Sequence, residues 1–178
     1  DFHDGSYGFR PGRSPHAALH EVRERCMREG IGWIVDADVS GYFDSIDRTR
    51  LREVLRKRVN DGRILRLIGK WLRAGVSEEG QWSETTVGVP QGAVVSPLLA
   101  NVYLHYVFDL WVQRWRTTQA HGDVVVVRFA DDFVVGVQHR AEAERFLAEL
   151  RERFARFGLT LHPDKTRLLE CGRSADQH

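Results

Sequence analysis

The sequence has few of the residues that mark disulfide-rich, membrane or disordered proteins. Its two cysteines, Cys26 and Cys171, form no spaced motif, so nothing indicates a disulfide framework or a zinc ribbon. No apolar run approaches the length of a membrane span, and no signal peptide opens the chain. Repeats and low-complexity linkers are also missing. With 42% apolar and 29% charged residues, we expect one folded cytoplasmic domain over residues 1–178, with no membrane partner.

A large excess of charge of one sign is missing too, because the net charge is only +1. The distribution of charge is uneven, however. From Arg48 to Arg73 there are ten basic residues, opposed only by Glu53 and Asp61. Such a stripe suits a phosphate backbone, and a solvated helix face is an equally good interpretation.

Capping residues and a 3.6-residue apolar period predict the helices. The predicted N-caps are Ser14, Asp47, Asp61 and Ser96, and Gly30 ends the first helix. The predicted helices are 15–30, 48–59, 62–75, 97–118 and 140–157, with a short helical turn at 77–80.

Strands are fewer and are enriched in valine and aromatic residues. The predicted strands are 33–39, 124–129, 133–137, 159–161 and 167–170, the last two flanking the turn HPDK. With the helices at 48–75 set aside as an insertion, the element order is βαββαβ. The sequence therefore predicts an α+β fold with a ferredoxin-like core and a helical insertion.

The most apolar stretch of the chain, VVVVRFADDFVVGV at 124–137, has Asp131 and Asp132 at its centre. Burying neighbouring carboxylates is costly unless a cation compensates them. In a βαββαβ sheet the first strand lies beside the central hairpin, so we expect Asp38 to come close to both residues. Asp36 shares the face of Asp38, because side chains alternate along a strand.

At least three carboxylates can therefore converge, and hard oxygen ligands suit Mg²⁺ or Mn²⁺. Two such ions can assist an in-line phosphoryl displacement. In the alternative interpretation, Asp131 and Asp132 only cap backbone amides of a tight turn. For the ADD tip alone that alternative is favoured. Asp38 on the neighbouring strand and the basic stripe reverse the balance.

Five separated stretches occur in a fixed order: YGFRPGRSPHAAL, DADVSGYFDSID, GVPQGAVVSPLLANVYL, RFADDFVV and GLTLHPDKT. Their order and spacing resemble reverse transcriptases of the bacterial group II intron type over nearly the whole chain. Two departures are mild: FADD stands where tyrosine is more common before Ala-Asp-Asp, and PQGAVVSP lacks a second glycine. The Gln-Gly…Ser-Pro form argues against diversity-generating reverse transcriptases.

The resemblance implies a polymerase palm with part of the fingers. The implied activity is RNA-directed DNA synthesis, which adds dNTPs to a DNA primer on an RNA template with two Mg²⁺ ions, and intron RNA is a further implied partner. Both ends of the sequence look cut, so we expect a fragment that lacks the upstream fingers and the thumb. Efficient polymerisation by this fragment alone is therefore doubtful.

The resemblance also implies residue roles. Asp38 and Asp131 would hold both metal ions, Asp132 would support them, and the backbone carbonyl of Val39 would add a ligand. Asp36 matches no ligand of the family, and we interpret it as a supporting or structural residue.

Three further residues of the motifs would contact the nucleotide. Phe43 would press on the sugar and exclude a 2′-hydroxyl, Gln91 would hydrogen-bond the nucleotide, and Gly92 would permit close backbone approach. Taken singly, Phe43 is better interpreted as a core aromatic residue. Gln91 and Gly92 taken alone are weak evidence, and a plain turn is their alternative interpretation.

Lys165 resembles the lysine proposed to protonate the pyrophosphate leaving group, although a solvated turn lysine is as good an interpretation. Arg10 and Arg13 resemble the motif at the junction of fingers and palm, where they would meet template phosphate or support the nucleotide pocket. His16 and His20 have a spacing that can ligate zinc, but the sequence shows no third ligand.

Other functions stay open at this point. The chain is alternatively an RNA-binding splicing factor (maturase) or a catalytically incomplete remnant of a mobile element. An RNA-templated RNA polymerase would share the palm chemistry, but Phe43 argues against it because such an enzyme must admit the 2′-hydroxyl.

Overall fold

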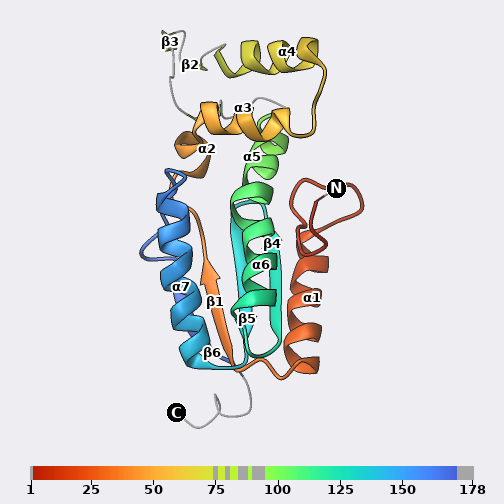
Figure 1. The fold of residues 1–178 in the computed structure, drawn as a ribbon, viewed down its shortest axis with the longest axis vertical. Helices are drawn as coiled ribbons and strands as arrows, with labels where there is room; N and C mark the ends of the chain where they lie inside the picture. The colour runs from red at the N-terminus through yellow and green to blue at the C-terminus, as the bar shows by residue number, and fades with distance from the viewer. Residues whose placement is uncertain (1, 74–75, 79–80, 84–87, 90–94, 172–178) are drawn as a thin grey trace.

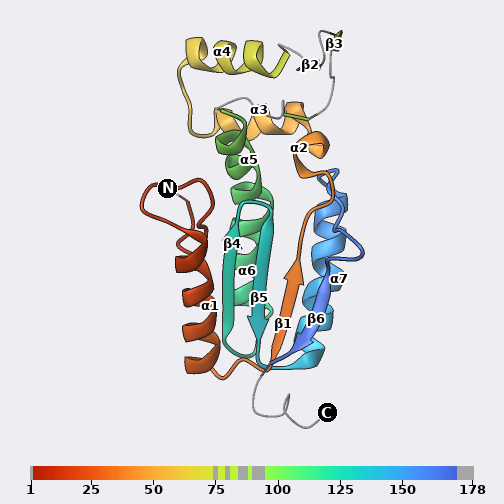
Figure 2. The ribbon, with the colours of Figure 1, turned by 180° about the vertical axis from the view of Figure 1, so that it is seen from behind.

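A four-stranded antiparallel sheet forms the centre of the protein, in a computed structural model that describes residues 2–73, 76–78, 81–83, 88–89 and 95–171. The strand order is β4-β5-β1-β6, and the four strands lie side by side in Figure 2. Their bounds are β1 (Trp33–Ala37), β4 (Val124–Phe129), β5 (Asp132–Val137) and β6 (Arg167–Glu170). The first strand pairs with the second strand of the hairpin, which confirms the predicted ferredoxin-like core.

Helices cover both faces of this sheet, which explains why β4 is buried along most of its length. Val125 and Val127 face α1 (Pro15–Arg28), whereas Val124 and Val126 join the larger core. Since side chains alternate across a strand, a sheet covered on both faces needs an unbroken apolar run. The larger core also contains residues of α5 (Ser96–Leu104), the π-helical segment η1 (His105–Asp109), α6 (Leu110–Thr118) and α7 (Arg140–Ala155).

The insertion forms a separate layer at one end of the sheet (Figure 1). It contains α2 (Tyr42–Ser45), α3 (Arg48–Arg56), α4 (Gly62–Arg73), β2 (Val76–Glu78) and β3 (Gln81–Ser83). The Asp47 side chain accepts hydrogen bonds from two backbone N–H groups of α3, and Asp61 accepts one from Arg63, as the predicted N-caps require. β1 points toward this layer, so its last residues lie between the sheet and the insertion.

Four local predictions were wrong. Val76–Glu78 is a strand paired with Gln81–Ser83 rather than part of a helical turn, because three-residue strands are too short to show a period. The stretch 159–161 makes one bridge, Val39 to Leu161, instead of a strand. The N-cap of α5 is Val95, not Ser96. The predicted helix at 97–118 is interrupted by η1, and α2 was not predicted at all.

No helix in the described part of the chain is long and apolar enough to cross a membrane. Both cysteines are free: Cys26 is buried and Cys171 is partly buried.

Candidate active site

Strand register brings the predicted carboxylates together. The β1–β5 ladder ends at Ala37 opposite Phe133, so one further step places Asp38 opposite Asp132. The hairpin closes between Phe129 and Asp132, which leaves Asp131 in a two-residue turn. The predicted proximity of Asp38 to the hairpin tip is therefore built into the pairing of β1 with β5.

The three carboxylates differ in exposure. Asp38 is buried, with 7% of its surface exposed, and Asp131 is partly buried. Asp132 is exposed although it lies in the most apolar stretch of the chain. It is the first residue of β5, and the residues that follow it in the strand are buried or partly buried.

Electrostatic coupling shows that these groups share one site. Burial raises the pKa of the Asp131 carboxyl, and the charge of Asp38 raises it further. The pKa of Asp132 is also raised, first because neighbouring atoms partly desolvate its carboxyl and then by the charges of Asp38 and Asp131. Because like charges disfavour ionisation of one another, a cation is the natural partner of this cluster.

Lys165 supplies such a cation from the turn that precedes β6. Its Nζ lies 2.7 Å from Oδ2 of Asp38, and this hydrogen bond raises the pKa of the ammonium. The turn is held by His162, whose N–H donates to the carbonyl oxygen of Asp38 and whose carbonyl accepts from Thr166. Although 61% of the Lys165 side chain is exposed, its charged end is not simply solvated.

The donor set has the chemistry of a divalent-metal site. No group of three or more His, Cys, Asp or Glu side chains in the described ranges is arranged closely enough to hold a metal ion as it stands. The ammonium of Lys165 nevertheless stands beside Asp38 as a cation, and the coupled carboxylates offer the hard oxygens that Mg²⁺ and Mn²⁺ prefer. The residues present therefore fit a Mg²⁺ or Mn²⁺ ion that takes over the charge compensation from Lys165.

Val39 is placed so that its carbonyl can join this set. In the bridge between Val39 and Leu161, the hydrogen bonds run from Ser40 to Thr160 and from His162 to Asp38. Val39 therefore occupies the non-hydrogen-bonded position, and its own carbonyl takes no part in the bridge.

Phe43 borders the same crevice as Asp131. The crevice is narrow and is also lined by Ala130 and Asn101. The ring of Phe43 lies 5.8 Å from that of Tyr42, whose hydroxyl donates to the Ala100 carbonyl at 2.5 Å. Phe43 is only partly buried, so it is packed on the core and also faces the site.

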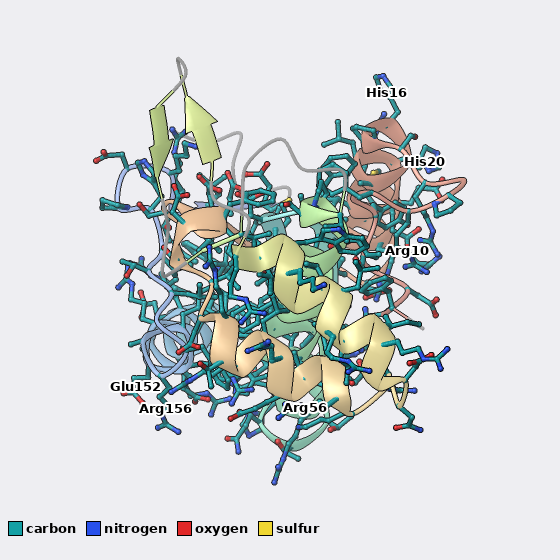
Figure 3. The ribbon with its side chains drawn as sticks, turned by 90° about the horizontal axis from the view of Figure 1, so that it is seen from above. Arg10, His16, His20, Arg56, Glu152 and Arg156 are labelled. Atoms are coloured by element: carbon teal, nitrogen blue, oxygen red, sulfur yellow. The ribbon has the colours of Figure 1, made fainter. Side chains whose placement is uncertain are left out.

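Of the other predicted contacts, Gln91 and Gly92 lie outside the described residues. Nη1 of Arg10 donates to the carbonyls of His3 and Ser6, which folds this side chain back onto its own segment (Figure 3). Arg13 donates to the Asp4 carbonyl, and its guanidinium lies 4.6 Å from the centroid of the Tyr7 ring.

Asp36 and the two histidines lie outside the cluster. Asp36 is partly buried on β1, between Val134 and Arg167, and it adds only a small charge effect at Asp132. His16 and His20 are exposed on α1, and Nε2 of His20 lies 3.7 Å from Glu24 (Figure 3). Among the described residues no metal-ligating group of three forms around them.

Most of the predicted basic stripe faces solvent on α3 and α4 (Figure 3). Two members are partly buried: Nε of Arg48 donates to the Gly88 carbonyl at 2.6 Å, and the guanidinium of Arg50 lies 5.0 Å from the centroid of the Phe157 ring. The exposed members are Arg52, Arg56, Lys57, Arg58, Arg63, Arg66, Lys70 and Arg73.

Arg128 was not predicted from the sequence; it is 1% exposed and donates to the Ala130 carbonyl in the turn between β4 and β5. A basic residue at the end of a run of four valines was the available signal, because a buried charge requires specific partners.

Comparison with known proteins gives consistent similarities. A family model described as "Reverse transcriptase (RNA-dependent DNA polymerase)" matches residues 1–175. Protein YkfC of Escherichia coli is 34% identical over 198 residues, covering 94% of this chain and 52% of YkfC. The group II intron-encoded protein LtrA of Lactococcus lactis is 43% identical over 104 residues, covering 58% of this chain and 17% of LtrA. The chain thus spans about half, or less, of the length of these relatives.

Among solved structures, apo telomerase from Candida tropicalis superimposes with a TM-score of 0.71 at 14% identity. The match covers 96% of this chain and 34% of the telomerase chain. At this identity the similarity concerns the fold, and it supports the palm-like α+β arrangement.

Proposed function

This chain belongs to the reverse transcriptase family, and we propose that it contains the catalytic carboxylates of an RNA-directed DNA polymerase of group II intron origin. One observation carries the proposal: the β1–β5 register places Asp38 beside the turn that holds Asp131 and Asp132. The partners would be an RNA template, a DNA primer and dNTPs, with intron RNA as a further partner. The cytoplasmic location expected from the sequence stays a prediction.

The reaction is the attack of the primer 3′-hydroxyl on the α-phosphorus of a dNTP, with pyrophosphate as the leaving group. Asp38 and Asp131 would hold Mg²⁺ or Mn²⁺ together with the Val39 carbonyl, and Asp132 would strengthen the local negative field. The bound metal would lower the pKa of the hydroxyl and neutralise charge on the phosphoryl oxygens. The mutual repulsion of the carboxylates in this structure supports a cation-binding role.

Neighbouring residues would select and orient the nucleotide. Phe43 borders the crevice at Asp131, where a ring of that size would collide with a 2′-hydroxyl. Lys165, whose ammonium is paired with Asp38, would act near the pyrophosphate. Gln91, Gly92 and Arg10 keep the nucleotide-binding or template-binding roles that the resemblance implies.

Primer extension on an RNA template tests this function. We expect Mg²⁺-dependent DNA synthesis by the wild-type full-length protein and a loss of about a hundredfold or more in its Asp131→Asn/Asp132→Asn variant, because several kcal/mol of transition-state stabilisation would be removed. Asp123→Asn, an exposed carboxylate at the opposite end of β4, is the matched control. Equal synthesis by the wild type and the double variant would disprove the site assignment.

A maturase role is the second candidate, and the exposed basic residues on α3 and α4 favour it. RNA binding measured beside synthesis separates the two functions. If the folded wild-type full-length protein binds RNA and makes no DNA under any metal condition, the splicing-factor interpretation replaces the polymerase.

A further inference from the structure

Arg128 is the most deeply buried charged side chain near the candidate site. It lies in β4, three residues before Asp131, and only 1% of its surface is exposed. Taking a guanidinium out of water is expensive unless every donor is paired. The partners of the Arg128 guanidinium therefore indicate which part of the structure this buried charge holds in place.

All five N–H donors of the guanidinium are hydrogen-bonded. Nε and Nη2 form a two-pronged pair with the Asp109 carboxylate at 2.8 and 2.7 Å. Nη2 also donates to Ser6 Oγ at 3.0 Å, and Nη1 donates to Asn101 Oδ1 at 2.7 Å. The remaining bond, 2.8 Å long, goes from Nη1 to the backbone carbonyl of Ala130.

Asp109 is a suitable anchor for this arrangement. It is 3% exposed, and burial alone would raise its pKa, but the charge and hydrogen bonds of Arg128 hold that pKa below its ordinary value. Asp109 is therefore ionised at neutral pH, and the pair is charge-balanced in the interior.

The π-helical segment brings Asp109 and Asn101 to the same guanidinium. The two residues are eight positions apart. An α-helix turns about 100° per residue, so on a straight α-helix the directions of these two side chains would differ by about 80°. The π turn accommodates one extra residue, which reduces the angle between the two directions to about 20°. The segment His105–Asp109 therefore aligns both partners on the face that meets β4.

The Ala130 carbonyl belongs to a strained turn. Ala130 has a φ of 57°, a left-handed conformation that disfavours residues with a Cβ by about 1–2 kcal/mol. On its other side, Gly8 packs so closely that a Cβ there would collide with the backbone nitrogen of Ala130. Asn101 donates from Nδ2 to the Gly8 carbonyl at 2.6 Å. Asn101 therefore contacts both Arg128 and Gly8, the two residues that hold the Ala130 turn.

We propose that Arg128, held by Asp109 and Asn101, is a positioning residue that fixes the strained Ala130 turn and thereby the place of the Asp131 carboxylate. The inference rests on the proposed function, since it assigns Arg128 to the metal-binding geometry of that site. The alternative is that the network only stabilises the fold. Apolar replacement of a complete buried ion pair is often neutral for stability, so the two alternatives are separable.

The decisive variant is Arg128→Met/Asp109→Leu, which removes both charges together and leaves no unpaired buried ion. We expect it to fold, with Mn²⁺ affinity measured by calorimetry weakened about tenfold or more, as for loss of residues that support metal ligands. The Mg²⁺ concentration for half-maximal DNA synthesis should rise by a similar factor, and hydrogen exchange at residues 129–132 should become faster. Affinity for the primer–template should stay unchanged.

Trp115→Phe is the matched control, because it removes one hydrogen bond, from Nε1 to Glu149 Oε2 at 3.0 Å, between α6 and α7. It should lower the melting temperature without changing Mn²⁺ affinity. Wild-type Mn²⁺ affinity and metal dependence in the folded double variant would overturn the proposal and leave the network a purely structural role.

If the double variant does not fold, Arg128→Lys replaces it as the test. Lysine keeps the charge opposite Asp109 but has only three donors and no planar fork, so it cannot also hold the Ala130 carbonyl. The same loss of Mn²⁺ affinity is expected, and an unchanged affinity would overturn the proposal. Failure of the proposed function gives a different result: the wild type and Asp131→Asn would bind Mn²⁺ equally.

Discussion

Asp131, the candidate catalytic residue of the hairpin, is placed against its own preference. Its carboxylate is partly buried and faces the charge of Asp38, and both features disfavour the ionised side chain in the folded state. The left-handed backbone of the neighbouring Ala130 disfavours the turn itself. Strain and repulsion of this kind are common at functional sites, where the rest of the fold over-determines the local geometry.

The raised pKa of Asp131 predicts a stability effect at the residue scale. A carboxyl whose folded pKa exceeds its unfolded pKa binds its proton more tightly in the folded state, so stability falls as pH rises between the two values. In metal-free buffer at pH 7, Asp131→Asn should therefore raise the melting temperature. At a pH below the ordinary carboxyl pKa, where Asp131 is protonated, this advantage should disappear. Thermal unfolding at both pH values measures it.

In the presence of Mg²⁺ at pH 7, the wild type should instead have the higher melting temperature. The metal would bind the wild-type carboxylate and stabilise the folded state, whereas Asp131→Asn offers one ligand fewer. Asp123→Asn, at the other end of β4, should show neither effect. A melting temperature of Asp131→Asn at or below that of the wild type in metal-free buffer would contradict the electrostatic account.

At the scale of elements, the short segment from Gly5 to Gly8 lies along the free edge of β4 and hydrogen-bonds to its backbone. Arg128 donates its backbone N–H to the Gly5 carbonyl, and Tyr7 donates to the Arg128 carbonyl, both at 2.7 Å. Gly5 packs against the Val126 carbonyl as closely as Gly8 packs against Ala130, leaving no room for a Cβ. The segment therefore covers the free edge of β4 and supports the turn that holds Ala130 and Asp131 at the same time.

Gly8→Ala should destabilise the protein, because its methyl group must displace backbone rather than a flexible side chain. Overpacking of this kind costs about 1–3 kcal/mol, which lowers the melting temperature by roughly 2–4 °C per kcal/mol in a domain of this size. Gly62→Ala is the matched control, because a Cβ at Gly62 meets no atom within 4 Å. Calorimetry should find it unchanged or slightly stabilised, as alanine favours helix more than glycine does. Equal effects of both substitutions would refute the close packing of Gly8 on the turn.

At the scale of the whole molecule, the insertion places positive charge at the end of the sheet that carries the carboxylates. Figure 1 shows α2, α3 and α4 beyond the tip of β1, and the exposed Arg and Lys side chains of α3 and α4 extend that end of the protein. A phosphate backbone drawn to this layer would lie close to Asp38 and Asp131. The net charge of the chain is only +1, but the fold gathers the exposed basic residues of α3 and α4 at one end of the molecule.

Salt dependence of RNA binding tests this arrangement. Arg56→Gln/Arg63→Gln removes two exposed charges from α3 and α4. The slope of log affinity against log salt for single-stranded RNA should decrease in magnitude by up to about 0.7 per lost contact. Arg23→Gln/Arg151→Gln removes two exposed charges from α1 and α7 and should leave the slope unchanged. A uniform effect of both pairs would show that RNA responds to net charge and not to this layer.

Much of the fold was readable from local signals. The caps Ser14 and Asp47 and the strand 124–129 were predicted as observed, because capping and periodicity depend on neighbouring residues only. The βαββαβ order then sufficed to predict that Asp38 meets the hairpin tip, which the register confirms. The roles of Phe43, Gln91, Lys165 and Arg10 stay predictions of the resemblance.

By itself, then, the sequence predicted most of the core helices and strands and their order, because these follow from short-range patterns. The resemblance of its five motifs predicted the family that the family model shows. Only the tertiary structure decided the exposure of Asp132, the pairing of Lys165 with Asp38, and the burial of Arg128 among Asp109, Asn101 and Ser6. These contacts join residues far apart in the chain. Their existence depends on sheet register, on the π turn that rotates Asp109 into place, and on the covering of both sheet faces.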